Sequence, residues 1–400
     1  MSNFNYNRKA QNDNEVYSQR KNIVKSVLLV ILLLALALLL KIRADLPEPV
    51  AATPSPTVAV TPTATPSPTP IPTPEPTPNY YTVSAIGDCT LTSHQMLGDS
   101  SPYSYAGRMQ GDYSYPFSNT SQYFLNDDFT ISNLECTLSD TTLYSPQQFY
   151  FRAPTAYANI LINGGVDFVT TANNHSADFG DTGKDNTYAA LTEYGIPFGK
   201  EDEAQLLTTS SGLVIGVYCA FNDYLPDTDK CAAAIASLRE QGAEYIICAF
   251  HWGQELKYRP NQNQVDLARA CIDAGANLVY GSHPHCLQPI EEYNGGVILY
   301  SMGNWSFGGN TSPTDRDTAI VQIKVKRDID GKITNDGYTI IPCCVSSLPV
   351  GSDNGADNDY KPTPYEEGSE EYERALSKIT GTYQGPDGTA DYSSWYSSYG

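Results

Sequence analysis

Six apolar stretches of this chain each end in polar side chains, and this pattern constrains the fold more than any other feature. Each stretch is rich in Val, Ile, Tyr and Phe and is bounded by turn residues, which is typical of buried β-strands. They cover residues 80–88, 128–135, 166–175, 244–253, 277–285 and 295–305. Stretches with helical spacing lie between several of them, at 183–195, 229–243 and 262–276, each with a glycine at its end. This alternation predicts an α/β fold with mainly buried sheets.

The polar ends of these strands hold four of the five histidines in the chain. In open α/β sheets, ligands bind outside the carboxyl ends of the strands, so we expect one rim to gather these side chains. The metal-capable residues at the strand ends are Asp88, Glu135, Asn174, His175, His251, His283 and His285. The remaining histidine, His94, lies six residues beyond Asp88, and we interpret it as incidental.

Oxygen and imidazole ligands in one set suit Mn, Fe(II) or Zn. One ion would leave ligands unused, whereas two ions about 4 Å apart, bridged by a carboxylate, would use them all. Two histidines spaced one residue apart around Pro284 can reach two neighbouring ions. We expect three glycines to let the backbone pass close to the cluster. These are Gly87, Gly281 and Gly303.

Each candidate also has a simpler interpretation. Asp, Glu, Asn and His often serve in turns and helix caps. His251 could stack beside Trp252, and His175 could be a ligand, an acid or a structural residue.

The N-terminal part of the chain differs from the rest. Residues 27–40 form an unbroken apolar run, which flanking residues extend to 23–42, and basic residues precede it. This favours a single membrane span with residues 1–22 in the cytoplasm and the main domain outside the cell. A cleaved signal peptide is the alternative, but no small-residue cleavage site follows. Residues 43–79, rich in proline and threonine, are expected to form an extended linker.

The net charge and the cysteine spacing argue against some classes of protein, namely nucleic-acid-binding, zinc-knuckle and disulfide-framework proteins. The net charge is −21, and residues 1–43 carry seven Lys or Arg and two Asp or Glu, which leaves about −26 for the remainder. Such a field disfavours nucleic acid as a partner and favours cations, although solubility alone would also explain it. The nine cysteines show no zinc-knuckle or disulfide-framework spacing.

Six motifs together resemble the CapA family of poly-γ-glutamate capsule synthesis proteins, whose domain is similar to calcineurin-type metallophosphatases. They occur in the family's order at residues 85–91, 131–140, 170–183, 251–255, 281–295 and 299–307. The resemblance spans about residues 82–345. It implies a four-layer α/β/β/α sandwich with a two-metal cleft.

Carried over to this chain, the resemblance implies specific roles. The metal ligands would be Asp88, Glu135, Asn174, His251, His283 and His285, with two divalent ions of Mn, Fe or Zn. Glu135 would take the bridging position. His175 would protonate the leaving group, and Asp178, in the same motif, would be a second catalytic residue.

The first motif departs from the general metallophosphatase pattern, which is Asp-x-His. Here it reads Asp88-Cys89-Thr90, so one ligand to the first ion is missing or replaced. Cys89 could replace it only if the backbone turned the thiol inward.

Two functions of different class follow, and the sequence leaves both open. The first is a membrane-anchored extracellular hydrolase acting on a phosphoester or related bond. The second is a non-catalytic accessory protein in making, exporting or anchoring an anionic polymer such as poly-γ-glutamate, together with other membrane proteins of capsule synthesis. A purely structural wall protein would leave the strand-end histidines unexplained.

The folded domain is predicted to cover residues 80–350. Residues 351–400 are acidic and rich in Gly, Ser and Tyr, and we expect a largely disordered tail with one possible helix at 366–379.

Overall fold

The computed structural model describes residues 77–95, 97–141, 149–222 and 227–387. The predicted membrane span and nearly all of the predicted linker lie outside these residues. Within the described ranges, no helix combines the length and apolar content needed to cross a membrane.

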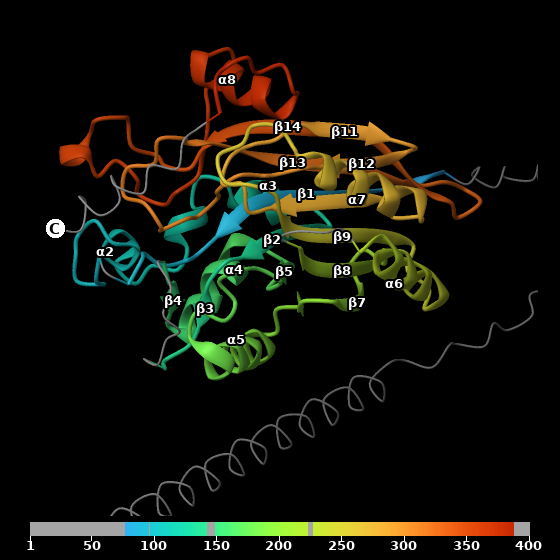
Figure 1. The fold of residues 1–400 in the computed structure, drawn as a ribbon, viewed down its shortest axis with the longest axis horizontal. Helices are drawn as coiled ribbons and strands as arrows, with labels where there is room; N and C mark the ends of the chain where they lie inside the picture. The colour runs from blue at the N-terminus through green and yellow to red at the C-terminus, as the bar shows by residue number, and fades with distance from the viewer. Residues whose placement is uncertain (1–76, 96, 142–148, 223–226, 388–400) are drawn as a thin grey trace, which may run out of the picture. The chain divides into compact units, whose positions relative to one another are not determined.

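Two mixed sheets form the centre of the fold, and their strands run side by side in Figure 1. The seven-stranded sheet has the order β15-β14-β13-β1-β2-β5-β6. Its strands are β1 (Asn79–Cys89), β2 (Phe129–Leu134), β5 (Phe168–Thr170), β6 (Phe198–Gly199), β13 (Asp317–Arg327), β14 (Ile333–Cys344) and β15 (Thr363–Pro364). Strands β1, β2, β5 and β6 are parallel, and β13 to β15 continue the sheet in antiparallel pairs.

The six-stranded sheet has the order β11-β12-β10-β9-β8-β7. Its strands are β7 (Glu203–Thr208), β8 (Val214–Asn222), β9 (Tyr245–Trp252), β10 (Leu278–Ser282), β11 (Ile290–Tyr293) and β12 (Gly296–Leu299). The four central strands are parallel and the two edge strands are antiparallel to them. A separate pair, β3 (Thr137–Leu138) and β4 (Arg152–Ala153), completes the strands of the described residues.

Helices cover the outer faces of both sheets. The first sheet is covered by α2 (Tyr105–Met109), α3 (Ser121–Phe124), α4 (Ala158–Gly164) and α5 (Gly180–Tyr194), and the second by α6 (Thr228–Glu240) and α7 (Gln262–Asp273). The described residues also form three short 3-10 helices, Tyr115–Phe117, Thr155–Tyr157 and Asp353–Gly355. The three long helices that the periodicity predicts are therefore present as α5, α6 and α7.

Three apolar clusters hold these layers together. One lies between the sheets and includes Ile131 and Ile247, one joins the first sheet to its helices, and one joins the second sheet to α6 and α7. The order is helices, sheet, sheet, helices, as expected for a four-layer sandwich. Because the inner faces of both sheets are buried and mainly apolar, polar side chains collect where the strands end.

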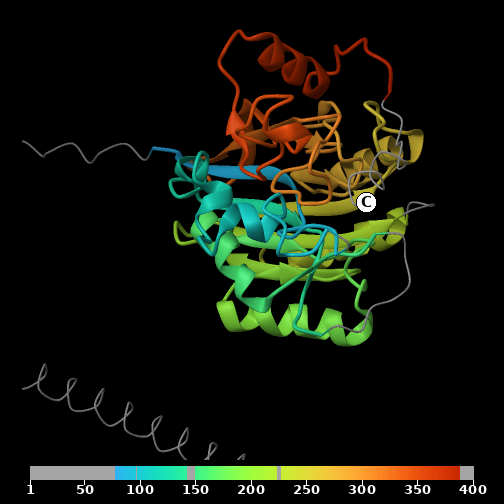
Figure 2. The ribbon, with the colours of Figure 1, turned by 90° about the vertical axis from the view of Figure 1, so that its left-hand side faces the viewer.

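Residues 351–387 differ from the expected disordered tail. They include helix α8 (Glu370–Ile379), which lies within the range 366–379 where a helix was expected. Ser369 caps this helix, which lies above β14 in Figure 1 and is the dark red helix at the top of Figure 2. Tyr360 is buried in the cluster of the first sheet, and Ile379 is buried in the cluster between the sheets. The composition of this segment does not indicate its packing, because the apolar residues that Tyr360 and Ile379 contact lie on strands far away in the sequence. Residues 388–400 lie outside the described residues.

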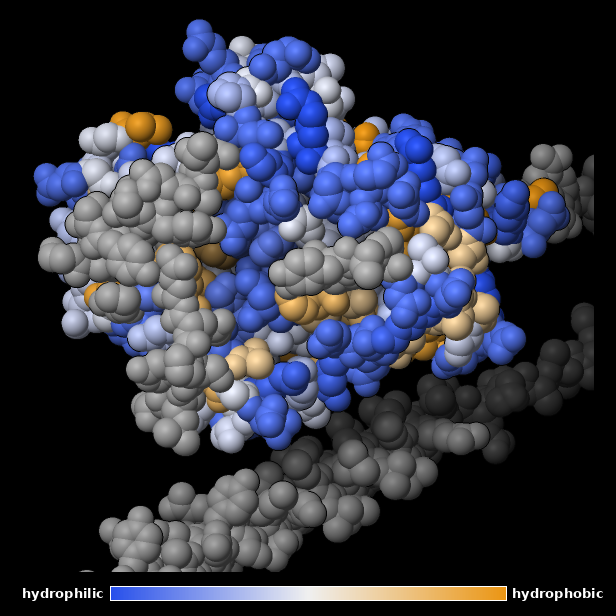
Figure 3. All heavy atoms as spheres, in the orientation of Figure 1, coloured by the Kyte–Doolittle hydropathy of each residue, from blue (hydrophilic) through white to orange (hydrophobic). Residues whose placement is uncertain are grey.

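The exterior agrees with the acidic composition. The face drawn in Figure 3 is mainly hydrophilic, with apolar residues in small separate areas. All nine cysteines lie in the described part of the chain and are free thiols, so no disulfide contributes to this fold.

Candidate metal centre

The candidate site lies where the parallel strands of both sheets end. Asp88 is the penultimate residue of β1, and Glu135 follows β2 directly. His251 lies in β9 opposite Ser282, the last residue of the neighbouring β10, so the next residue of the chain, His283, begins beside His251. The two sheets are joined at this point, because the Tyr280 hydroxyl of β10 donates to the Ile86 carbonyl of β1 over 2.7 Å.

The structure brings the predicted ligands together in two overlapping groups. Within each group, the ligand atoms all lie within 4.8 Å of one another. One group is Glu135, His283 and His285, and the other is Asp88, Glu135 and His251. Glu135 is common to both, which is the arrangement expected of a bridging carboxylate. Asn174 joins the second group, because its Oδ1 lies 2.7 Å from Nε2 of His251.

The side chains at this point fit divalent cations. Asp88 and Glu135 are both 0 % exposed. Among the described residues, Glu135 Oε1 and His283 Nδ1 are buried without a hydrogen-bond partner. A buried polar atom without a partner is costly unless an ion or a ligand satisfies it. The site therefore offers carboxylate and imidazole ligands, two of which have an atom without a hydrogen-bond partner. This set matches a Mn, Fe or Zn site.

The pKa values of the cluster have the same physical origin. Burial raises the pKa of Glu135 well above its usual value, and it lowers the pKa of His251 well below its own. Burial and the neighbouring His285 lower the pKa of His283 to about 4. Burial alone would lower the pKa of His285, but the carboxylates of Glu135 and Asp88 outweigh it and raise that pKa to about 10. The imidazoles of His251 and His283 are therefore neutral, as metal ligands must be. The carboxylates of Glu135 and Asp88 attract positive charge to the cluster.

The backbone of residues 283–285, which we call the HPH loop after His283, Pro284 and His285, is strained. His283 and His285 adopt φ values of 97° and 54°, a region that residues with a side chain rarely occupy. Such strain costs roughly 1–3 kcal/mol per residue and persists where the surrounding structure requires it. The His283 amide donates to Asp88 Oδ2 over 3.3 Å, and Nδ1 of His285 lies 2.9 Å from Asn304 Oδ1. Both imidazoles are therefore held at the cluster by contacts to β1 and to the segment after β12.

Two glycines allow the close approach that the sequence predicts. A Cβ on Gly87 would lie 2.0 Å from the Gly303 carbonyl oxygen, and one on Gly281 would lie 2.1 Å from the Tyr300 carbonyl oxygen. The segment after β12 can therefore contact the ends of β1 and β10. The Asp88 amide donates to the Gly303 carbonyl over 2.8 Å, which fixes the backbone that carries the first carboxylate.

Gly87→Ala is expected to destabilise the fold by about 3 kcal/mol, because the new methyl group meets backbone rather than a flexible side chain. Gly331→Ala is the control: its φ is 82° but its surroundings are open, so only strain of about 1 kcal/mol is expected. Urea unfolding of both variants measures the difference. Equal losses would show that the close approach at Gly87 is not rigid.

His175 lies beside Asn174 and is oriented by Asp178. Nδ1 of His175 is 2.9 Å from Asp178 Oδ2, which also accepts the Phe151 amide over 2.7 Å. The fully buried carboxylate favours a proton on Nδ1, which directs Nε2 away from Asp178. Asp178 is therefore a positioning residue for His175.

Asn133 belongs to the site although the sequence assigned it no role. Its amide nitrogen donates to Asp88 Oδ1 over 2.9 Å and lies 3.3 Å from both Glu135 Oε2 and His251 Nδ1. Its carbonyl oxygen accepts from Asn173 over 3.0 Å. Asn133 thus links both carboxylates to the loop that carries Asn174 and His175. The signal was its spacing, since residues two apart on a strand share a face and Asn133 stands two before Glu135.

Thr90 and Cys89 do not replace the missing histidine. The Thr90 hydroxyl donates to the Thr92 carbonyl over 2.9 Å and accepts the Gly308 amide over 2.7 Å, so it holds backbone together. Cys89 packs in the cluster between the first sheet and its helices, where burial raises the pKa of the thiol to about 12. Cys89 is in neither group of potential ligands among the described residues.

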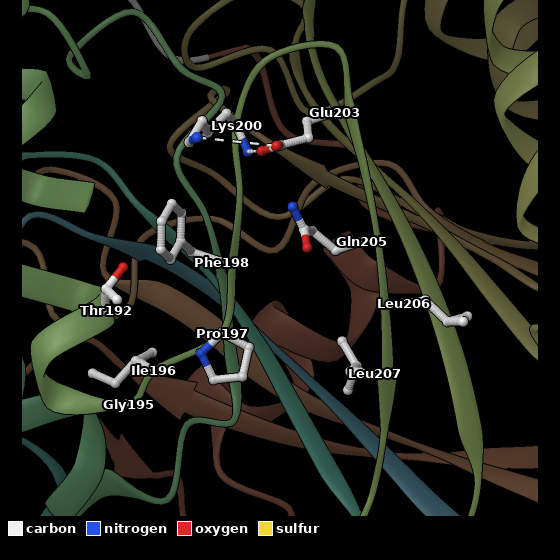
Figure 4. A pocket seen from close by; sticks show the side chains of 10 residues that line it. All are labelled: Thr192, Gly195, Ile196, Pro197, Phe198, Lys200, Glu203, Gln205, Leu206 and Leu207. Carbon is white, nitrogen blue, oxygen red and sulfur yellow. Dashed lines mark hydrogen bonds and ion pairs between the residues drawn. The ribbon is translucent and has the colours of Figure 1, made fainter. Parts of the chain in front are cut away.

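A pocket of about 310 Å³ lies away from this centre, between the end of α5 and the edge strands β6 and β7. Figure 4 shows Phe198, Pro197 and Leu207 around it, with Lys200 and Glu203 at one side. None of the predicted ligands lines it.

Comparison with known proteins places this site in a family. A model of the family described as bacterial capsule synthesis protein PGA_cap matches residues 82–308. The PGA biosynthesis protein CapA of Bacillus subtilis is 28 % identical over 239 residues, which cover 54 % of this chain and 62 % of that protein. The capsule biosynthesis protein CapA of Bacillus anthracis is 27 % identical over 242 residues, covering 53 % and 58 %. The match thus spans less than two thirds of either relative.

Solved structures show weaker likeness. The NAD nucleotidase of Haemophilus influenzae aligns with a TM-score of 0.39 and 13 % identity over 80 % of this chain and 67 % of that one. A purple acid phosphatase from yellow lupin aligns with a TM-score of 0.31 and 12 % identity, over 66 % and 53 %. At these TM-scores the alignments do not establish a shared fold.

Proposed function

This chain belongs to the bacterial capsule synthesis protein PGA_cap family, and we propose that it acts in the synthesis, export or anchoring of poly-γ-glutamate or a related anionic polymer. The two Bacillus relatives are named as proteins of PGA or capsule biosynthesis, which supports this context. We further propose that residues 23–42 anchor the chain in the membrane and that the folded domain acts outside the cell, beside other membrane proteins of capsule synthesis.

The candidate metal centre is proposed to hold two divalent ions and to hydrolyse a phosphoester or related bond. One observation carries this proposal: two fully buried carboxylates meet three imidazoles, and Glu135 Oε1 lacks a hydrogen-bond partner among the described residues. Bound ions would supply Lewis acidity and an activated water.

The side chains of this centre have separate tasks in that reaction. Asp88, Glu135, Asn174, His251, His283 and His285 would hold the ions. Asp178 keeps His175 oriented, and an imidazolium there would give its Nε2 proton to the leaving oxygen. Asn133 holds the carboxylates of Asp88 and Glu135 in place.

A non-catalytic role is the second candidate, and Thr90 favours it. Because the Thr90 hydroxyl is occupied by backbone contacts, the first ion would be one ligand short of the metallophosphatase pattern. Such a centre would bind carboxylates of an anionic polymer without cleaving them.

The test combines metal content with activity on the purified full chain. After incubation with Mn²⁺, Fe²⁺ or Zn²⁺, elemental analysis is expected to find one or two equivalents per chain. Panels of phosphoester and γ-glutamyl substrates then separate the candidates. Turnover supports the hydrolase, whereas metal-dependent binding of poly-γ-glutamate without turnover supports the accessory role. A folded chain that takes up no metal would reject the hydrolase.

A further inference from the structure

The segment 370–387 contacts the loop that follows His251, although it lies outside the residues that match the family model. We call residues 370–387 the C-terminal clamp. The ammonium of Lys378 lies 4.6 Å from the centre of the Tyr258 ring. The Tyr258 amide donates to Asp387 Oδ1 over 3.1 Å, and Arg259 donates to the Tyr383 carbonyl over 3.0 Å. The clamp thus holds one side of the 255–259 loop.

The other side of the same loop is bonded to the HPH loop. The Leu256 amide donates to the Pro284 carbonyl over 2.8 Å, and Pro284 separates the two histidines of the candidate centre. The Lys257 carbonyl accepts from Gln288 Nε2 over 2.7 Å and from the Cys286 thiol over 3.3 Å. The 255–259 loop therefore lies between the clamp and the segment that carries His283 and His285.

A buried ion cluster attaches the clamp to the domain. Lys378 is 3 % exposed, and its ammonium lies 2.8 Å from Asp315 Oδ1 and 2.8 Å from Asp317 Oδ2. Arg374 donates to both oxygens of Asp317 over 2.8 and 2.7 Å. Removing one member of such a cluster leaves a buried charge without its counter-charge, which is strongly destabilising. The four side chains must therefore keep their relative positions. Lys378, which contacts the ring of Tyr258, is thus itself held by two buried carboxylates.

We propose that the C-terminal clamp is a positioning element of the metal centre. It holds the 255–259 loop, and through this loop it keeps the strained backbone of His283 and His285 in the conformation that directs both imidazoles to Glu135. Positive φ values at two non-glycine residues need such support from outside the loop. The inference rests on the proposed metal binding and assigns a role to a part of the chain beyond residues 82–308.

Lys378→Met in the full chain tests this. Mutation of a residue that orients metal ligands typically lowers metal affinity 10- to 100-fold. We therefore expect the affinity of Lys378→Met for Mn²⁺, measured by equilibrium dialysis, to be about tenfold lower than that of the wild type. Hydrogen exchange should also quicken at the amides of Leu256 and Tyr258. Two controls accompany it. Lys332→Met makes the same change at an exposed position, and Ile235→Ala destabilises the buried face of α6.

The outcomes separate this inference from the proposed function. A wild type that binds Mn²⁺ beside a Lys378→Met variant of unchanged affinity overturns the positioning role alone. A wild type that binds no metal overturns both proposals. An equal loss in Ile235→Ala would mean that general destabilisation is the cause, which also overturns it. If Lys378→Met does not fold, Tyr383→Ala/Asp387→Ala is the second variant. It removes the Tyr383 ring, whose centre lies 5.0 Å from that of Tyr258, and the Asp387 carboxylate that accepts the Tyr258 amide, while it keeps the ion cluster. The same loss of affinity is expected.

Discussion

Glu135→Gln is expected to lower the affinity of the full chain for Mn²⁺ or Zn²⁺ by about 100-fold or more, at the upper end of what even indirect changes to a metal site cause. Glu135 is the one residue common to both groups of potential ligands, so its replacement affects both ions. Glutamine keeps the shape and one acceptor oxygen for Asn133 but removes the charge that attracts the cation. Isothermal titration with each metal measures the loss.

The same variant has an opposite expected effect on the metal-free protein. Burial raises the pKa of Glu135, which means that the charged carboxylate destabilises the fold at neutral pH when no cation is bound. Metal-free Glu135→Gln should therefore unfold at the same temperature as the wild type or higher. His283→Ala/His285→Ala should also lose metal, but its metal-free form should be less stable, because only His251 of the three imidazoles then remains beside the two buried carboxylates.

Glu193→Gln is the matched control, because Glu193 is exposed on α5. It should change neither metal affinity nor unfolding temperature. Unchanged metal affinity in Glu135→Gln would show that Glu135 is not a ligand, and the assignment of a bridging carboxylate would be lost.

His175→Asn is expected to lower kcat by about 10²- to 10⁴-fold on any substrate that the protein hydrolyses, which is the usual contribution of a positioned acid or base. Metal content should stay at the wild-type value, because His175 contacts Asp178 and Phe151 rather than the two ligand groups. Asp178→Asn should reduce kcat less, since it disturbs only the orientation of the imidazole. The measurement is kcat beside elemental analysis of the same samples.

A parallel fall in metal content and kcat would instead make His175 part of the ligand set. A His175→Asn variant with full metal and full activity would remove the acid from the mechanism. In the accessory role no turnover exists to be lost, and polymer binding should then be the same in His175→Asn and wild type.

The candidate ligands could be predicted because the reason for their proximity is local. A strand of alternating or continuous apolar residues ends where polar residues begin, and parallel strands end on one side of a sheet. Asp88, Glu135, His251 and the HPH loop follow this rule, and the structure gathers them. Asn174 follows it through its loop, by contact with His251.

Other parts of the site depend on contacts between residues far apart in the chain. Asn133 becomes important only because β1 and β9 place Asp88 and His251 beside it. Thr90 appeared to be a lost ligand, but Gly308, 218 residues away, makes its hydroxyl part of the backbone packing. Residues 351–400 were predicted from composition to be largely disordered, with one possible helix at 366–379. That helix is present as α8, and Asp315 and Asp317 supply the partners that hold it against the domain.

The amino-acid sequence by itself determined six of the strands, the three long helices, the strand-end placement of the metal-capable residues and the family, because hydrophobic periodicity and short motifs are local properties. It did not indicate strands β7, β8, β11, β13, β14 and β15 or helices α2 to α4. Only the tertiary structure decided which of those residues meet, which atoms are left unsatisfied, and that an acidic C-terminal segment closes against the loop beside the HPH motif. These depend on burial and on pairing between distant residues, and a buried charge has no defined cost until the fold places its partners around it.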